Sequence, residues 1–280
     1  MSGVIACDIW GIKMAEYTAR VGNVEMVSLT DGQGDRDPVE TFPDSTGEQW
    51  RAEYPDLLDS NGRIHPRYGT VAVRSAGKLI IVDTGLQAPD GKLLDDMRGK
   101  GVDRDAVDIV VLTHLHGDHV GWNLTDGRPT FPNARYLATR TDWDYWTAPS
   151  VQERASHIRE QVLPLQDLDI LDLIDGEYEI TPELTALPTP GHTPGHISVA
   201  IYSDGERGLI LGDIAHSPAQ VHHTDWNPIF DIDQTQSRKT RHRLFDRLEE
   251  EGSLVSAGHF PGSGFGRLVR TEGRRVWQGI

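Results

Sequence analysis

The chain has 280 residues, of which 37% are hydrophobic and 25% charged, and its formal net charge is −16 at pH 7. This length is typical of one or two domains. Single α/β domains of this size are common, and we expect one globular domain over residues 1–280. No run of eighteen apolar residues occurs, so we expect no membrane-spanning segment. The negative charge would repel a phosphate backbone, which argues against nucleic acid as a partner.

The first residues and the cysteine content bear on the cellular compartment. The N-terminus carries no recognisable secretory signal, and the single cysteine, Cys7, cannot form an intrachain disulfide. Both observations fit a reducing compartment, so we expect a cytoplasmic protein. The sequence leaves open whether the chain is a monomer or a homodimer.

The first third of the chain is expected to contain strands on either side of a long irregular segment. Alternating apolar residues predict a strand over 20–30, and prolines interrupt residues 35–68, where only a short helix over 50–58 is expected. A segment of this length inside a compact domain is usually functional or mobile, so 35–68 is a candidate lid. Residues 70–74 and 79–82 then predict a hairpin.

The middle of the chain alternates strands with helices. In chain order we expect a short helix around residue 93, strands over 109–112 and 134–138, and helices over 141–146 and 152–162. This alternation is typical of an α/β fold.

The second half of the chain adds more strands and one long helix. Residues 171–174 and 178–180 flank an Asp-Gly turn and predict a hairpin. A helix over 234–250 carries the basic segment 238–243, which we interpret as a solvated helix face rather than a binding patch. Further strands are expected over 184–188, 197–202, 209–211 and 254–256.

Four potential metal ligands follow the apolar strand 109–112 within six positions. They are His114, His116, Asp118 and His119. Three imidazoles and a carboxylate crowded at a strand exit would be costly if unpaired, and these groups are the ligands that zinc and similar ions take. The stretch therefore predicts a metal site, and a solvated His-rich loop is the weaker alternative. Asp83, at the end of an earlier strand, is expected to hydrogen-bond backbone or a ligand imidazole.

Three more potential ligands stand at three more strand exits. They are His192, Asp213 and His259. Strands that deliver polar residues from the same end of a sheet build the sites of α/β folds, so we expect all seven to converge. Seven ligands are too many for one tetrahedral zinc. They suit two metals about 3.5–4 Å apart, with one carboxylate bridging and a water or hydroxide between them.

These motifs resemble those of the metallo-β-lactamase superfamily. The matching residues are His114-x-His116-x-Asp118-His119, the segment TPGHTPGH at 189–196, the Gly212-Asp213 pair and the late His259. The resemblance implies an α/β fold of four layers, an αβ/βα sandwich with the metals at one edge. His196 would not be a ligand. The implied ligands are His114, His116 and His192 for the first metal, Asp118, His119 and His259 for the second, and Asp213 as the bridge.

Within this superfamily the chain most resembles the branch of methyl parathion hydrolase and related lactonase-like dizinc enzymes. The local features are FPNA at 131–134 with DYW at 144–146, GDIAH at 212–216, and the Pro-Gly-rich stretch after His259. In acyl-homoserine lactonases of the superfamily a tyrosine stands in place of His216, which counts against a homoserine-lactone substrate. The overall pattern is compatible with lactone, carboxyl ester or phosphotriester chemistry.

The ligands and the resemblance together predict a hydrolase with two divalent metal ions, zinc being the first choice. In this hypothesis a bridging hydroxide attacks a lactone, carboxyl ester or phosphotriester, and Asp118 accepts a proton while it holds the second ion. His216 is a second catalytic candidate, with a structural role as an equal alternative. The expected partner is a small neutral ester or lactone. The alternative functions are a mononuclear iron oxidoreductase, like the superfamily's persulfide dioxygenases, and β-lactam hydrolysis.

Aromatic residues near the ligands are expected to form an apolar wall that sets substrate choice. These residues are Trp122, Trp146, Trp226 and Phe260. Trp146 is the candidate substrate-binding residue, because it matches by motif a pocket tryptophan in the methyl parathion hydrolase branch. The alternative is that Trp146 belongs to the core face of a helix.

Overall fold

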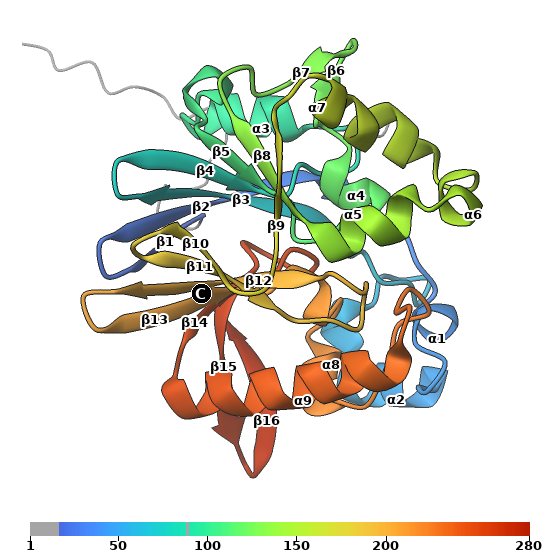
Figure 1. Cartoon of the computed structure of the whole chain (residues 1–280). Helices are drawn as coiled ribbons and strands as arrows, with labels where there is room; N and C mark the ends of the chain where they lie inside the picture. The colour runs from blue at the N-terminus through green and yellow to red at the C-terminus, as the bar shows by residue number, and fades with distance from the viewer. Residues whose placement is uncertain (1–16, 88–89) are drawn as a thin grey trace, which may run out of the picture.

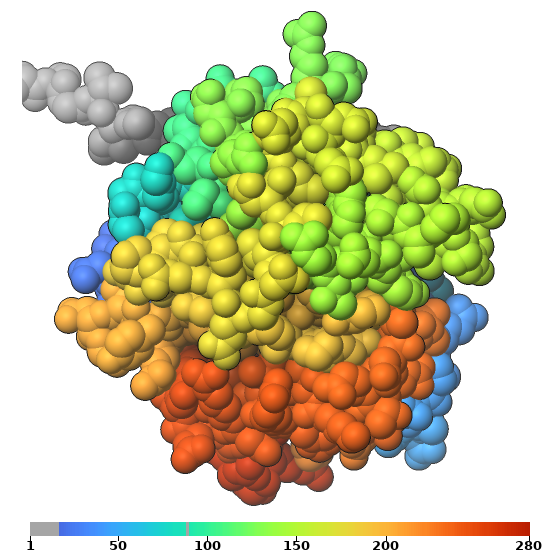
Figure 2. Space-filling view, viewed as in Figure 1, coloured from blue at the N-terminus to red at the C-terminus, as the bar shows by residue number. Residues whose placement is uncertain are grey.

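Two seven-stranded sheets lie face to face in the computed structural model, which describes residues 17–87 and 90–280. Helices cover the outer face of each sheet, so the chain forms four layers (Figure 1). The predicted αβ/βα sandwich is thus confirmed. In the space-filling view the green and yellow part of the chain lies above the orange and red C-terminal part (Figure 2). Cys7 lies outside the described residues.

The N-terminal half of the chain forms the first sheet. Its order is β1-β2-β3-β4-β5-β8-β9, antiparallel from β1 to β4 and parallel from β4 onward. Parallel neighbours need long crossovers, which here run through helices on the outer face. The strands are β1 (Thr18–Val21), β2 (Val24–Gln33), β3 (Arg67–Ser75), β4 (Lys78–Val82), β5 (Ile109–Val111), β8 (Arg135–Thr139) and β9 (Leu171–Ile174). The other elements of this half are α3 (Leu93–Gly99), α4 (Gly117–Val120), α5 (Arg140–Thr147), α6 (Pro149–Gln152), α7 (Leu163–Asp167) and the small pair β6 (Leu124–Thr125) and β7 (Arg128–Pro129).

The C-terminal half forms the second sheet, in which the strands follow one another in chain order. Only the β13–β14 pair is parallel, and α8 and α9 cover the outer face. The strands are β10 (Tyr178–Thr181), β11 (Leu184–Pro188), β12 (Ile197–Ser203), β13 (Glu206–Ile210), β14 (Leu254–Ser256), β15 (Phe265–Thr271) and β16 (Arg274–Gly279). The helices are α8 (Ala219–His222) and α9 (Gln234–Glu251).

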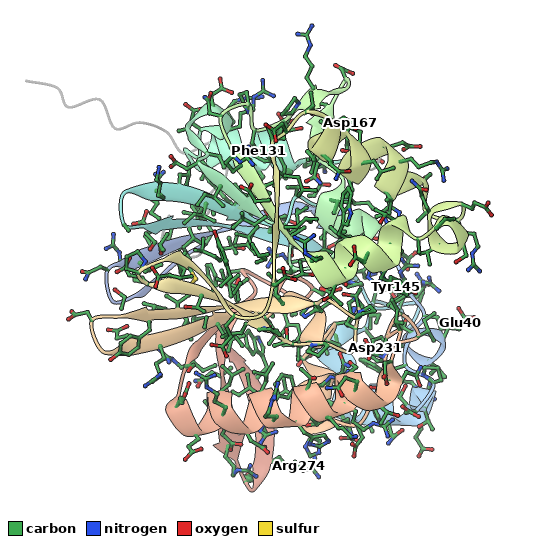
Figure 3. All side chains as sticks on the ribbon, in the orientation of Figure 1. Glu40, Phe131, Tyr145, Asp167, Asp231 and Arg274 are labelled. Carbon is green, nitrogen blue, oxygen red and sulfur yellow. The ribbon has the colours of Figure 1, made fainter. Side chains whose placement is uncertain are left out.

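Hydrophobic cores fill the spaces between the four layers. Successive residues of a strand point to opposite faces, so Ile80 packs between the two sheets while Ile81 packs against the helices of the first half. Phe131 belongs to the core between the first sheet and its helices, called the upper helical core (Figure 3). Phe245 of α9 belongs to the core between the second sheet and its helices. All four side chains are fully buried. No helix among the described residues is long and apolar enough to cross a membrane.

The candidate lid, residues 35–68, folds against the C-terminal half of the chain. It contains α1 (Pro38–Thr41) and α2 (Gly47–Glu53), which lie beside α8 and α9 (Figure 1). Side chains of the two regions share a small core, which consists of Phe42, Trp50, Ile64, Ala219 and Trp226. The mobility of this segment stays a prediction.

Most predicted strands and helices are present, with shifted ends. The predicted strand 20–30 is instead the hairpin β1–β2, which turns at Gly22 with a φ of 55°. Glycine adopts this left-handed conformation without steric cost, so the turn is possible inside an apolar stretch. The hairpin β15–β16 was not predicted from the sequence.

The predicted hairpin around Asp175-Gly176 is wrong. β9 pairs in parallel with β8 in the first sheet, whereas β10 pairs with β11 in the second sheet. The Asp-Gly turn therefore carries the chain from one sheet to the other. Ile174 and Ile180, on either side of the turn, pack in the core between the sheets, and this shared burial replaces direct strand pairing.

The predicted continuous helix over 152–162 is also wrong. α6 ends at Gln152, and the chain resumes as a π-helical turn over Ile158–Val162 that leads into α7. Residues 153–155 are non-helical and separate the two parts. Pro164, in the first turn of α7, has no backbone N–H and its ring crowds the carbonyl four residues earlier, which accounts for the π-helical turn before it.

Candidate metal centre

The ligand cluster after β5 is held by the short helix α4. His116 is the N-cap of this helix, and His114 lies in the loop that precedes it. Asp118 and His119 lie on α4 itself. The other three predicted ligands come from the second half of the chain. His192 follows β11, Asp213 follows β13 and His259 follows β14.

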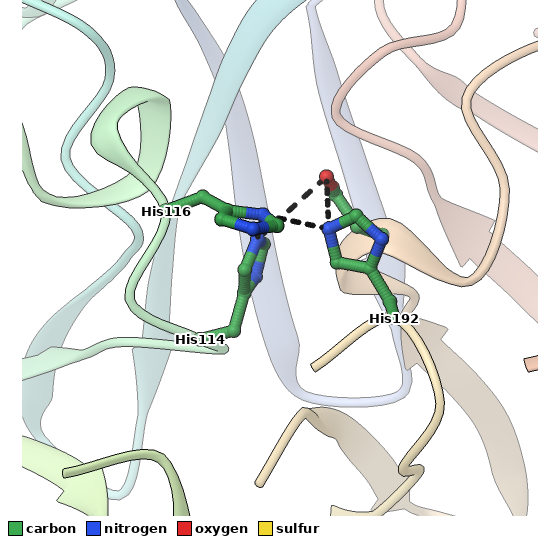
Figure 4. A group of neighbouring side chains, drawn as sticks. His114, His116 and His192 are labelled. Atoms are coloured by element: carbon green, nitrogen blue, oxygen red, sulfur yellow. Dashed lines mark hydrogen bonds and ion pairs between the residues drawn. The ribbon is translucent and has the colours of Figure 1, made fainter. Parts of the chain in front are cut away.

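Three imidazoles and one carboxylate form a first group of ligand atoms. The His116 Nδ1 atom lies 3.0 Å from the His114 Nε2 atom and 2.9 Å from the His192 Nε2 atom (Figure 4). Asp213 Oδ2 lies 3.3 Å from His192 Nε2 and 3.7 Å from His114 Nε2. Ring nitrogens that converge with a carboxylate oxygen in this way are the donor arrangement that a divalent ion takes.

A second group shares the same carboxylate oxygen. Asp118 Oδ2 lies 3.8 Å from His119 Nε2 and 3.7 Å from His259 Nε2. Asp213 Oδ2 lies 3.3 Å from His119 Nε2 and 3.1 Å from His259 Nε2. It also lies 3.1 Å from His216 Nε2. Asp213 therefore stands between the two groups, and the structure brings all seven predicted ligands together.

The imidazoles of the first group are held neutral. Burial is the main effect and lowers the pKa of His114, His116 and His192, that of His116 to about 4. A neutral imidazole is the form that binds a metal ion. These three rings are therefore available as ligands at neutral pH without losing a proton.

The second group is governed by its carboxylates. Burial lowers the pKa of His119 and His259, but the negative charge of Asp213 and Asp118 outweighs burial and raises both values. Burial raises the pKa of Asp118, but the two imidazoles outweigh it and lower the value. The negative charges of Asp118 and Asp213 therefore favour a positive charge at this position, and a bound metal cation would supply it.

The donor set fits two divalent metal ions. In the described part of the chain, three overlapping clusters of potential ligands meet at this site: three histidines with Asp213, Asp118 with two histidines, and Asp213 with His216 and His259. Asp213 Oδ1 is buried and has no hydrogen-bond partner among the described residues. An uncompensated buried carboxylate oxygen is costly, and a nearby cation would remove that cost.

Asp83 orients His119, as predicted. Its Oδ1 atom accepts a hydrogen bond from the Thr113 backbone N at 2.8 Å, and its Oδ2 atom lies 2.8 Å from both Thr113 Oγ1 and His119 Nδ1. A proton held on Nδ1 by this contact leaves Nε2 of His119 free to face the ligand cluster.

His196 positions the shared carboxylate rather than joining the ligands. Its Nε2 atom accepts a hydrogen bond from the Asp213 backbone N at 2.8 Å, and its Nδ1 atom lies 2.8 Å from Thr189 Oγ1. Burial lowers the His196 pKa to about 3, so the ring stays neutral and can accept. Gly212 is required here, because its φ is 60° and a Cβ atom would lie 2.5 Å from His196 Nε2.

A buried ion pair orients His192. The His192 Nδ1 atom lies 2.9 Å from Asp231 Oδ1, and Asp231 Oδ2 accepts a hydrogen bond from Arg241 Nη2 at 3.1 Å. Figure 3 shows Asp231 close to the end of α9. The side chains of Asp231 and Arg241 are both 0% exposed. The interpretation of residues 238–243 as a solvated helix face is therefore wrong for Arg241.

Asp142 joins the loops that carry the ligands. Its Oδ2 atom accepts from the Leu115 backbone N at 3.1 Å and from Thr193 Oγ1 at 2.9 Å, and its Oδ1 atom accepts from the Gly195 backbone N at 2.6 Å. Leu115 lies between two ligands of the first half of the chain, whereas Thr193 and Gly195 follow a ligand of the second half. One buried carboxylate thus fixes the two loops relative to each other.

A cavity of about 360 Å³ opens onto the ligands, which is within the size range of small-molecule sites. Asp118 and His216, the two catalytic candidates, both line it. The candidate lid contributes Arg36, Thr41, Phe42, Ile64, Pro66 and Tyr68, and the remaining lining residues are Leu86, His116, Gly117, His192, Asp213, Phe230 and His259.

The four aromatic residues expected to form the cavity wall are Trp122, Trp146, Trp226 and Phe260. None of them is among the described residues that line the cavity. Trp146 is 9% exposed, lies in the upper helical core and packs edge-on against His116, with ring centroids 5.1 Å apart. The aromatic lining comes instead from Phe42, Tyr68 and Phe230.

Sequence reasoning missed Asp142, Asp231 and Arg241. Each lies far along the chain from the ligand, or the ligand-bearing loop, that it helps to hold in place, so the sequence spacing does not reveal its role. Arg241 alone leaves a signal, because it shares one face of α9 with the buried residues Leu244 and Leu248. A charged residue in an apolar helical stripe indicates a buried cation with a partner.

Comparison with known proteins identifies curated relatives. The chain is 26% identical over 170 residues to an N-acyl homoserine lactonase of Bacillus thuringiensis, an alignment that covers 61% of this chain and 62% of the relative. It is 30% identical over 150 residues to an N-acyl homoserine lactonase of Bacillus cereus, covering 54% of each chain. The chain thus spans less than two thirds of the length of these relatives.

Solved structures extend the similarity over almost the whole chain. The crystal structure of hydrolase AbOPH in the beta lactamase superfamily matches with a TM-score of 0.84 and 25% identity, covering 94% of this chain and 97% of that one. The dizinc quorum-quenching lactonase AidC matches with a TM-score of 0.82 and 22% identity, covering 94% and 96%, which shows a shared fold. The family model of the metallo-beta-lactamase superfamily matches residues 70–259. This span contains all seven converging ligands, and the chain belongs to the metallo-beta-lactamase superfamily.

Proposed function

We propose that this chain is a dinuclear metal-dependent hydrolase that opens lactones, with carboxyl esters and phosphotriesters as further candidate substrates. The observation that carries the proposal is the position of Asp213 Oδ2, within 3.7 Å of ligand atoms from both groups. A carboxylate shared by two sets of donors is typical of a two-metal site. In this proposal zinc is the metal, held by His114, His116 and His192 on one side, by Asp118, His119 and His259 on the other, and by Asp213 between them.

Two divalent ions would supply a water nucleophile that is deprotonated near neutral pH and a Lewis acid for the substrate oxygen. The protein contributes proton transfer and orientation. Asp118 lines the cavity with a side chain that is 24% exposed, so it can accept a proton and release it to solvent. His216 faces the same cavity, and its Nδ1 atom has no hydrogen-bond partner among the described residues. In this structure the Nδ1 atom is buried and the Nε2 atom lies 3.1 Å from Asp213 Oδ2, so a contact between His216 and a substrate or leaving-group oxygen requires the ring to turn toward the cavity.

The cavity supports a small ester-like substrate with one polar group. Phe42, Ile64 and Leu86 provide apolar surface, and the Arg36 guanidinium carbon lies 5.6 Å from the centre of the Phe230 ring. Arg36 lines the same cavity and can donate a hydrogen bond to a carbonyl oxygen, while the apolar residues hold a hydrocarbon chain. The names of the curated relatives favour a lactone, whereas His216 in place of a tyrosine favours a substrate other than a homoserine lactone.

A hydrolysis panel with metal-loaded protein tests the proposal. The panel contains N-acyl homoserine lactones, simple γ- and δ-lactones, aryl esters, phosphotriesters and β-lactams, and metal content is measured on the same preparation. We expect about two tightly bound zinc ions per chain and the highest kcat/KM for a lactone. One iron per chain with oxidation of a persulfide would instead establish the mononuclear oxidoreductase. Turnover of β-lactams alone would overturn the lactone assignment.

A further inference from the structure

Glu53, His222 and His223 form a further group of potential metal ligands, which lies outside the cavity and is separate from the two groups described above. Their ligand atoms all lie within 4.8 Å of one another. Glu53 is the last residue of α2, His222 is the last residue of α8, and His223 is the C-cap of α8. Glu53 Oε2 lies 3.0 Å from His223 Nε2. The cluster therefore joins the candidate lid to the second half of the chain.

Neighbouring rings fix the orientation of His223. Its imidazole stacks on Trp226, with ring centroids 4.0 Å apart and planes inclined by 5°. The Tyr54 ring meets it edge-on at 5.8 Å. A side chain held by stacking loses little additional freedom when it binds a ligand, which favours affinity.

His222 can also act as a ligand at neutral pH. Burial, then the neighbouring His223 and Arg274, lower its pKa, whereas Glu53 acts in the opposite direction. The ring is therefore neutral and can offer a lone pair. Figure 3 shows Arg274 at the lower edge of the protein, and its positive charge makes this group a weaker cation site than the buried cluster.

We propose that Glu53, His222 and His223 bind a third divalent transition-metal ion of the zinc class. Two imidazoles and one carboxylate are a donor set that zinc, cobalt, nickel and copper ions accept. Half-buried histidines and an exposed glutamate leave the remaining coordination positions to water. The proposal does not depend on the reaction that occurs in the cavity.

The position of the site predicts what the ion would do. Phe42 and Ile64 of the candidate lid line the catalytic cavity, and both pack in the small core with Ala219 and Trp226. A metal ion between Glu53 and the end of α8 would add a second attachment beside this core. It would hold the lid over the cavity without contacting the substrate.

Zinc stoichiometry in matched variants tests the site. Wild type, Glu53→Gln, His222→Ala and the control His242→Ala are dialysed together against the same micromolar concentration of free Zn²⁺, and zinc per chain is measured. His242 forms a hydrogen bond with Asp225 and belongs to none of the three-donor groups among the described residues, so its variant should match wild type. We expect Glu53→Gln and His222→Ala to contain one zinc ion fewer. Equal zinc content in all four proteins would overturn the proposal.

Hydrogen exchange tests the attachment of the lid. Added Zn²⁺ should slow exchange of the α2 amide hydrogens, such as the Trp50 N–H that donates to Thr46 O, in wild type but not in Glu53→Gln. Unchanged exchange in wild type would refute the attachment even if a third ion binds. Both readouts compare variants that share the same buried cluster, so inactivity towards lactones would not affect them.

Discussion

Replacement of Arg241 by methionine should both destabilise the fold and weaken metal binding. The guanidinium is fully buried and donates hydrogen bonds to the carbonyl oxygens of Ile214, Thr224 and Trp226. It also pairs with Asp231, which in turn contacts a ligand histidine. Methionine keeps much of the volume and removes every donor.

The expected loss follows from the charge that stays behind. Removing one partner of a buried ion pair costs about 3–5 kcal/mol, because the other charge is left uncompensated. For a chain of this size that loss corresponds to a decrease in Tm of roughly 6–20 °C. His192 would lose its fixed orientation as well, and loss of a group that orients a ligand lowers metal affinity by roughly 10–100-fold.

Denaturant unfolding in the presence of a chelator measures the first effect without a contribution from bound metal. Competition with a chromophoric zinc chelator measures the second. Lys239→Met is the matched control, because Lys239 is exposed on the same helix and should change stability by no more than about 0.5 kcal/mol.

The double variant Arg241→Met with Asp231→Asn separates the ion pair from simple loss of packing. Without the carboxylate charge, the double variant should be more stable than Arg241→Met alone. A loss below about 1 kcal/mol in Arg241→Met, or a double variant less stable than the single one, would refute the reasoning.

Four further outcomes are expected. Asp213→Ala should lose both metal ions or retain one weakly, and elemental analysis that finds two tightly bound ions would contradict its bridging position. His216→Ala should lower kcat with unchanged metal content if this residue contacts the substrate, whereas unchanged turnover would leave it a structural role. Trp146→Ala should cost about 3–5 kcal/mol of stability with unaltered substrate preference, and a raised KM for aryl substrates with an unchanged Tm would instead make it a pocket residue. The hydrogen bond that the His65 ring donates to the Asp59 carboxylate raises the pKa of His65, so the contact should stabilise the lid below pH 6.5 and be lost as the pH rises through the raised value. Hydrogen exchange of the lid, corrected for the intrinsic rate, should show this loss in wild type, and its persistence in His65→Gln would contradict the assignment.

The metal cluster was predictable because its chemistry is concentrated in short motifs. Three histidines and Asp118 within six positions after an apolar strand do not suit a hydrophobic core. His192, Asp213 and His259 each follow a predicted strand, which predicted that they would converge on the same site. The layer architecture followed from the same alternation of strands and helices together with the family resemblance.

The remaining features depend on contacts that spacing does not encode. The Asp-Gly turn at 175–176 has the local chemistry of a hairpin, and only burial against both sheets decides that it connects them. The cavity wall was misplaced for a similar reason. Phe260, which follows the ligand His259 in sequence, packs in the core against α9, and Trp146 packs among the helices of the first half, whereas Phe42 and Phe230 line the cavity.

The chain passes between the two sheets once, through residues 175–177, and this has a consequence for assembly of the centre. His114 and Asp118 precede the crossing, whereas His192 and Asp213 follow it, so each half of the chain holds an incomplete set of donors. Neither half should bind the ions tightly by itself. Two fragments separated at the crossing should instead recombine more strongly when zinc is present, with metal affinity serving as a measure of how well the halves dock.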